Sequence, residues 1–162
     1  MDFYDEELLN FWGCLNKNSV KYIMVGGVAI NFHGYNRTTD DIDIWLEDTL
    51  ENRKHLRAAF KEYGLGDLEP LLRIQFLPGW TYFHLNNGTR LDVMTYVKGI
   101  ENYTFDECLA LASIAEVYEV KIPFLHINHL LAAKKAANRP KDQLDIIELE
   151  KIRAYQQSKD TL

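Results

Sequence analysis

Two aspartates in the first third of the chain have the spacing of a metal-binding pair. They lie in the stretch Asp41-Ile42-Asp43-Ile44, whose alternation of polar and apolar residues is typical of a strand. Successive side chains of a strand point to opposite faces, so Asp41 and Asp43 share one face and the isoleucines point into the core. Two adjacent carboxylates repel each other, and a bound divalent cation relieves that repulsion. The alternative interpretation is a pair that lies idle at the solvated end of a strand.

A third aspartate interrupts another apolar stretch. Asp92 lies between Leu91 and Val93, so it faces away from the core if this stretch is also a strand. Alone, Asp92 is a weaker indication than the pair. If its strand neighbours the strand of Asp41 and Asp43, three carboxylates converge. Such a group suits two metal ions and in-line phosphoryl transfer.

A glycine pair precedes these acids. Gly26 and Gly27 follow the apolar run Tyr22–Val25 and come before a predicted short helix. Glycine allows a sharp turn and a close approach of a ligand to the backbone, and the first N–H groups of a helix attract anions. The pair matches neither the dinucleotide fingerprint nor a Walker A loop. Taken alone, it is better explained as a tight turn without a ligand.

These residues need a sheet to hold them, and the pattern along the chain predicts one. Strands are expected at residues 22–25, 41–46, 74–76, 81–85 and 89–97, with an extended segment at 115–126. Helices are expected at 3–17, 28–33, from a capping box at 48–51 to about 63, from 104, and at 128–138 and 140–156. Asn86-Asn87-Gly88 predicts a hairpin turn.

The predicted fold class is therefore α/β (α+β), with a mixed sheet flanked by helices and a C-terminal helical segment. A length of 162 residues fits a single domain, here 1–162, with a core at about 20–100 and a helical part at about 104–157.

Composition limits the classes of function. The net charge is −6, which argues against general nucleic-acid binding. Two distant cysteines form no disulfide framework and no CxxC metal pattern. The N-terminus lacks the basic and apolar regions of a signal peptide, and the longest apolar stretch is too short to span a bilayer. We expect a cytoplasmic protein without membrane partners.

Taken together, the motifs resemble a known superfamily. The order of strand, Gly-Gly, short helix, Arg-x-Thr-x-Asp-Ile-Asp and a distant aspartate strand is similar to the nucleotidyltransferases of the DNA polymerase beta type. The small bacterial stand-alone branch is the most similar, including lincosamide-type, minimal and abortive-infection toxin nucleotidyltransferases. The run from Leu130 to Ile146, with Lys134, Lys135 and Asp142, is similar to their helical tail. The resemblance covers roughly residues 20–150.

The resemblance implies a nucleotidyltransferase fold and a metal-dependent reaction. A nucleoside monophosphate would pass from an NTP, expected to be ATP, to an acceptor hydroxyl, with release of pyrophosphate. By matching positions, Asp41 and Asp43 would bind Mg²⁺ and the triphosphate. Asp92 would bind a second Mg²⁺ and act as general base. Mn²⁺ is the expected substitute metal.

The nucleotide-binding residues implied by the same resemblance are Gly26, Gly27, Arg37, Thr39 and Lys134. Many relatives have serine at position 27, so here phosphate binding would rest on backbone N–H groups. Arg37 either reaches the phosphates or forms a structural ion pair, for example with Asp41, and Thr39 fits a turn or a backbone cap. Lys134 is preferred over Lys135 because adjacent helical residues point in different directions.

Other side chains have structural explanations. Asp142 is expected to be a first-turn partner of the helix dipole and nothing more. Trp80, Tyr82 and Phe83 could stack on a base, but a place in the core is favoured for them.

Three functions remain open. The first is an enzyme that modifies a small molecule, such as the hydroxyl of an antibiotic. The second is a toxin–antitoxin enzyme that acts on a protein or on tRNA, and the third is a degenerate nucleotide-binding or structural relative. The short chain leaves few residues for an acceptor domain, so a homodimer or a cognate partner protein could complete the acceptor site.

Overall fold

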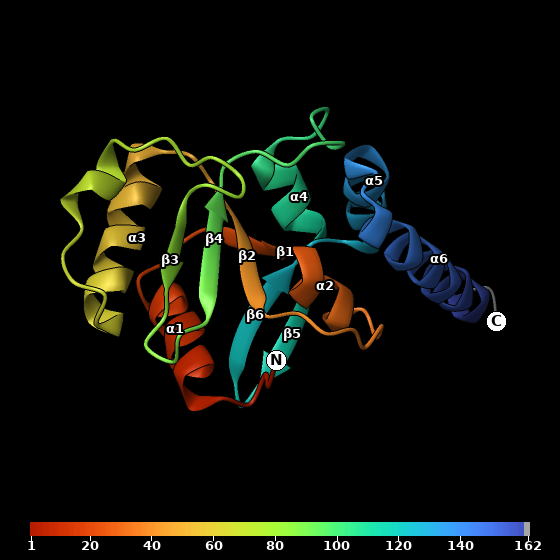
Figure 1. Cartoon of the computed structure of the whole chain (residues 1–162), viewed down its shortest axis with the longest axis horizontal. Helices are drawn as coiled ribbons and strands as arrows, with labels where there is room; N and C mark the ends of the chain where they lie inside the picture. The colour runs from red at the N-terminus through yellow and green to blue at the C-terminus, as the bar shows by residue number, and fades with distance from the viewer. Residues whose placement is uncertain (161–162) are drawn as a thin grey trace.

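The computed structural model describes residues 1–160 and consists of a mixed sheet with helices packed around it (Figure 1). The elements are, in chain order, α1 (Glu6–Lys17), β1 (Tyr22–Val25), α2 (Gly26–Phe32), β2 (Asp41–Leu46), α3 (Leu50–Tyr63), the 3-10 helix η1 (Glu69–Leu72), β3 (Tyr82–His84), β4 (Arg90–Met94), α4 (Phe105–Leu111), β5 (Ser113–Val117), β6 (Val120–Phe124), α5 (Ile127–Ala137) and α6 (Pro140–Asp160). Within residues 1–160 the sheet has six strands in the order β3-β4-β2-β1-β6-β5. The predicted mixed α/β fold is confirmed.

Strand β2 lies inside the sheet and carries the aspartate pair. It pairs antiparallel with β1 and parallel with β4, and in the second pairing Asp43 lies opposite Asp92. Residues opposite each other in neighbouring strands project to the same face of a sheet. The neighbouring strands that the three-carboxylate prediction required are therefore present.

The opposite face of these strands forms the core. Ile42, Ile44, Leu91 and Val93 have no exposed surface, as the alternation predicted. Helices α1 and α3 contact each other, and the ring of Phe60 in α3 lies 5.0 Å from a ring of β3, that of Phe83. Each fully buried aliphatic side chain contributes about 1.5–3 kcal/mol to folding. The acids thus face away from the apolar side that α1 and α3 cover.

Local signals locate several element ends correctly. Thr104 and Glu107 form a capping box at the predicted start of α4. The 86–88 turn is a hairpin turn, with the N–H of Leu85 donating to the carbonyl oxygen of Thr89 at 2.9 Å. The cap of α3 differs by one residue from the prediction. Its N-cap is Thr49, whose side chain accepts from the N–H of Asn52.

Three other predictions about the sheet region are wrong. Residues 74–76 are irregular rather than a strand. The segment 115–126 is not one extended stretch but belongs to the hairpin of β5 and β6, which turns at Tyr118 and Glu119. Both turn residues have positive φ, 45° and 67°, without the glycine or asparagine that usually announces such a turn. Trp80 and Tyr82 are 83% and 47% exposed instead of lying in the core.

The C-terminal helices α5 and α6 pack against each other, and the end of α6 extends away from the sheet (Figure 1). Pro140 begins α6, a position where its missing N–H costs nothing. The buried apolar side chains form one cluster that runs from Leu8 in α1 to Leu149 in α6. Within residues 1–160, no helix has both the length and the apolar character needed to cross a membrane.

Candidate active site

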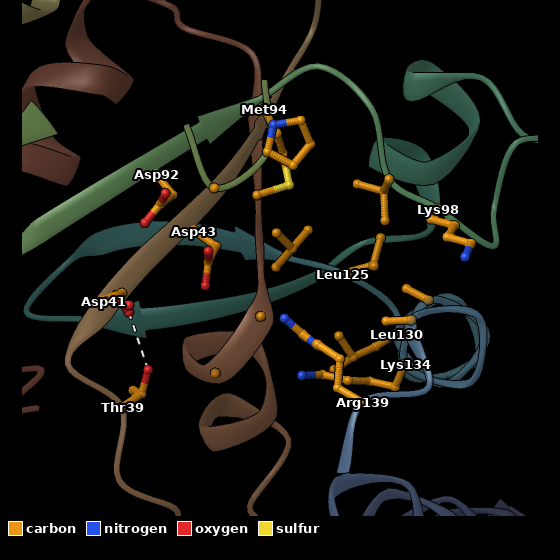
Figure 2. A pocket seen from close by; sticks show the side chains of 18 of the residues that line it. Thr39, Asp41, Asp43, Asp92, Met94, Lys98, Leu125, Leu130, Lys134 and Arg139 are labelled. Atoms are coloured by element: carbon orange, nitrogen blue, oxygen red, sulfur yellow. Dashed lines mark hydrogen bonds between the residues drawn. The ribbon is translucent and has the colours of Figure 1, made fainter. Parts of the chain in front are cut away.

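A pocket of about 510 Å³ opens on the face of the sheet that carries the aspartates (Figure 2). It is lined by Val25, Gly26, Gly27, Arg37, Thr39, Asp41, Asp43, Pro78, Gly79, Arg90, Asp92, Met94, Tyr96, Val97, Lys98, Leu125, Leu130, Ala133, Lys134, Ala137, Arg139 and Lys141. The lining includes all eight residues predicted from the sequence to bind the metal or the nucleotide, namely Gly26, Gly27, Arg37, Thr39, Asp41, Asp43, Asp92 and Lys134. The carboxylates lie on one side of the pocket in Figure 2, and the basic side chains of Lys98, Lys134 and Arg139 lie across from them.

The register of the strands arranges polar side chains in rows. Asp43 of β2, Asp92 of β4 and Tyr82 of β3 occupy matching positions on adjacent strands. The next row consists of Asp41 and Arg90, followed by a β3 residue. Positions two apart on a strand share a face, so both rows point into the same space. The polar face of β2, β4 and β3 is therefore a continuous surface beside the pocket.

The acids of the first row affect each other. Burial, together with the nearby negative charges of Asp92 and then Asp41, raises the pKa of Asp43 to about 6. Neighbouring carboxylates in a low-dielectric site favour either a shared proton or a bound cation. The site therefore has the electrostatic character of a cation-binding position around Asp43.

Asp92 already holds a cation, the guanidinium of Arg90. The Nε and Nη2 atoms of Arg90 donate to Oδ2 and Oδ1 of Asp92, each at 2.8 Å. Arg90 was not predicted as a site residue from the sequence. Its signal is the Arg-x-Asp spacing in a strand, which puts both side chains on one face.

The three carboxylates fit Mg²⁺ by their chemistry, because hard cations prefer oxygen ligands. Asp41, Asp43 and Asp92 are the residues that could hold it. Within residues 1–160, however, no three acidic, histidine or cysteine side chains are gathered closely enough to bind one ion. Both oxygens of Asp92 point to Arg90, so the strands bring the carboxylates to one face without joining them into one ligand set.

The glycines do not precede the helix as predicted but are the first two residues of α2, at the turn that follows β1. This turn lies directly beside Asp43, because Val25 pairs with Asp43 in the register of β1 and β2. Gly26 has a φ of +63°, and a Cβ on it would lie 2.9 Å from Cγ of Asp43. A Cβ on Gly27 would lie 2.8 Å from Cβ of Thr39. No side chain caps the N-terminus of α2. The two glycines thus permit the close packing between this turn and β2.

Thr39 and Arg37 have structural partners. Thr39 is buried and donates to the carbonyl oxygen of Asp41 at 3.3 Å, which fits the predicted backbone cap. Arg37 forms an ion pair with Asp145 of α6 at 2.7 Å rather than with Asp41. The structural ion pair considered for Arg37 is present, but with an acid 108 residues away.

Lys134 is buried and contacts two acids of α6. Its Nζ lies 3.1 Å from Asp142 and 3.1 Å from Asp145. Lys135 points outward and pairs with Glu150 on the surface. Lys134 is thus the lysine that faces the pocket, as the sequence analysis preferred. Asp142 lies in the first turn of α6 as expected, but the expectation that it has no further role is wrong, because it is completely buried and pairs with Lys134 and Arg139.

Two basic side chains of the pocket form no ion pair with an acid among residues 1–160. These are Lys98, in the loop after β4, and Lys141, in the first turn of α6. Neither was singled out as a site residue from the sequence, since an isolated lysine has no local signature. They are the lysines of the pocket that are available to an anionic ligand.

The comparisons with known proteins support the fold. Neither the family models nor the curated proteins include a match to this chain. Among solved structures, the chain is similar to the crystal structure of ANT(2")-Ia in complex with adenylyl-2"-tobramycin, at 16% identity and a TM-score of 0.50. The alignment covers 93% of this chain and 94% of the other. The two chains therefore share a mixed α/β fold over nearly the whole length of each.

Proposed function

We propose that this chain is a metal-dependent nucleotidyltransferase that moves a nucleoside monophosphate from an NTP to an acceptor hydroxyl. The observation that carries the proposal is the pairing of β2 with β4, which puts Asp43 and Asp92 side by side with Asp41 on the same face. The glycine turn and the basic side chains line the same pocket, as a triphosphate requires. The expected donor is ATP, and pyrophosphate is the second product.

Each side chain has a role in this reaction. Asp41 and Asp43 would hold Mg²⁺, which when bound neutralises the triphosphate and the charge that develops during transfer. Asp92 would accept the proton of the acceptor hydroxyl. The hydroxyl oxygen then forms a bond to the α-phosphorus while the bond from that phosphorus to the pyrophosphate oxygen breaks.

The remaining polar groups would position the donor. Gly26 and Gly27 let the phosphates approach the backbone. Lys98 and Lys141 would contact the phosphate oxygens, since both line the pocket and neither forms an ion pair with an acid among residues 1–160. Lys134 lies deeper and is paired with two acids, so we assign it to shaping the pocket as much as to binding phosphate.

A small molecule is the acceptor that we propose. The similar solved structure is a complex with adenylyl-2"-tobramycin, a small molecule. Pro78 and Gly79, which precede the edge strand β3, line the pocket, and Tyr82 of β3 occupies the register position next to Asp92. An acceptor that enters from this edge would bring its hydroxyl to Asp92 from the side opposite Asp43.

Calorimetric titration with each of the four NTPs in Mg²⁺ tests the donor site. The comparison is between the wild type and Asp43→Asn, which removes one charge from the pair without changing its size. Asp40→Asn is the matched control, because Asp40 precedes the pair and is exposed. We expect saturable, metal-dependent binding of an NTP that Asp43→Asn weakens at least about 10-fold and Asp40→Asn preserves. If no NTP binds the folded wild type, the proposed function is wrong.

A further inference from the structure

Arg90 forms an ion pair with Asp92, the carboxylate that the proposed reaction needs as its base. The guanidinium donates to both oxygens of Asp92, through Nε and Nη2, at 2.8 Å each. A two-point contact of this kind fixes the orientation of a carboxylate more firmly than a single hydrogen bond. Asp92 is only 5% exposed, so Arg90 is its main polar partner in the structure.

Other groups hold Arg90 in place. Its guanidinium carbon lies 4.1 Å from the centre of the Tyr82 ring, in a cation–π contact. Its Nη2 also donates to the carbonyl oxygen of Gly79 at 3.2 Å. Tyr82 belongs to the edge strand and Gly79 to the loop before it. The orientation of Arg90 therefore depends on the outer edge of the sheet, on the side away from Asp43.

We propose that Arg90 is a positioning residue that withholds Asp92 from metal binding until the acceptor arrives, an inference that rests on the proposed function. A guanidinium and a divalent cation compete for the same carboxylate oxygens, because each needs their lone pairs. With Arg90 in place, Asp41 and Asp43 would be the residues that hold a metal ion for the donor triphosphate. Asp92 could hold a second metal ion only after the guanidinium of Arg90 has left its oxygens.

The edge of the sheet allows this movement. The side chain of Arg90 is 35% exposed, and Tyr82 beside it is 47% exposed. An acceptor that enters along β3 meets these groups before it reaches Asp92. It would displace the guanidinium from Tyr82 and Gly79 and so free the carboxylate at the moment when a hydroxyl needs a base. Premature attack by water on the donor would be reduced as a result.

Counting bound Mn²⁺ by electron paramagnetic resonance tests the proposal without any measurement of activity. The protein is titrated with Mn²⁺ in the presence of the non-hydrolysable analogue of its preferred NTP and in the absence of an acceptor. Arg90→Gln removes the charge and the two-point contact. Arg73→Gln is the matched control, since Arg73 is exposed, pairs with Glu69 and lies outside the pocket.

We expect one tightly bound Mn²⁺ in the wild type and in Arg73→Gln. Arg90→Gln should bind a second Mn²⁺ as well, with an affinity for this second ion that is at least about 10-fold higher than in the wild type. Equal numbers and affinities in the wild type and Arg90→Gln would overturn the proposal, as would two equally tight ions in the wild type. Absence of bound Mn²⁺ and nucleotide in every variant would instead overturn the proposed function. If Arg90→Gln does not fold, Arg90→Lys replaces it in the titration, because lysine keeps the charge but cannot make the two-point contact. The same comparison of the second Mn²⁺ with the wild type then tests the proposal.

Discussion

Gly26 is the residue on which the geometry of the pocket depends most directly. Its φ of +63° lies in the left-handed region, which glycine adopts without the steric cost of a Cβ. The missing side chain also leaves room for the carboxylate of Asp43, its neighbour across β1 and β2. One small residue thus meets two requirements, a sharp turn and a close approach to an acid.

Replacing Gly26 with alanine should damage both stability and ligand binding. The strained backbone costs on the order of 1 kcal/mol, and the methyl group would push Asp43 from its position. We expect a lower free energy of unfolding in urea, with m unchanged, and loss of metal-dependent NTP binding by calorimetry.

Gly13→Ala is the control for this substitution. Gly13 lies in α1, and nothing would come within 4 Å of an added Cβ. Alanine there should raise stability by about 0.5–1 kcal/mol through its higher helix propensity and leave NTP binding intact. Full NTP binding by Gly26→Ala would contradict the role that we give to the turn.

Among the elements, α5 and α6 are joined to the sheet by buried charges. Lys134 of α5 pairs with Asp142 and Asp145 of α6, and Asp145 pairs with Arg37, which precedes β2. Arg139 in the connection between the helices also pairs with Asp142. The network therefore sets the position of α6 relative to both α5 and the strand that carries the aspartate pair.

Asp142 should contribute to stability in a pH-dependent way. Burial alone would raise the pKa of this carboxyl, but hydrogen bonds from Arg139 and Lys134 lower it below its ordinary value. A depressed pKa in the folded state means that the unfolded chain takes up the proton first as pH falls. The contribution of Asp142 is therefore present above about pH 4 and is lost progressively below it.

Asp142→Asn measures this contribution. At neutral pH we expect a loss of about 3–5 kcal/mol, because Lys134 and Arg139 lose a buried partner. The difference in unfolding free energy from the wild type should shrink as the pH is lowered below 4. Glu150→Gln breaks only the exposed pair with Lys135 and should cost less than about 1 kcal/mol. A deficit in Asp142→Asn that is the same at low and neutral pH would contradict the electrostatic explanation.

At the scale of the whole molecule, one cluster of buried apolar side chains connects the sheet with α1, α3, α5 and α6. Such a connected core favours a single cooperative unfolding transition. A ligand that binds only the folded state should then stabilise the whole chain and not just the pocket.

Differential scanning calorimetry can test this coupling with the preferred NTP and Mg²⁺. At a ligand concentration about 100 times its Kd, stabilisation is about 2.7 kcal/mol. For a chain of this length that corresponds to a rise in Tm of about 5–10 °C. Asp43→Asn should show little or no rise under the same conditions. Two separate transitions, of which the NTP shifts only one, would contradict a single cooperative unit.

The sequence by itself determined the parts that depend on local order. Alternation within β2 placed Asp41 and Asp43 on one face and Ile42 and Ile44 on the other. The start of α4 and the 86–88 turn were likewise predicted from a few neighbouring residues. These features follow from backbone geometry and hydrogen bonds within a few positions, so a short stretch of sequence contains all the information that they need.

Only the tertiary structure decided how these parts meet. The pairing of Asp43 with Asp92, the contact of Arg37 with Asp145 and the burial of Asp142 join residues that are far apart along the chain. Such contacts depend on strand order and helix packing, which no local pattern specifies. The hold of Arg90 on Asp92 is different, because the spacing was visible in the sequence. The role of Arg90 could not be predicted from this spacing, because it depends on the edge strand with Tyr82 lying beside Arg90.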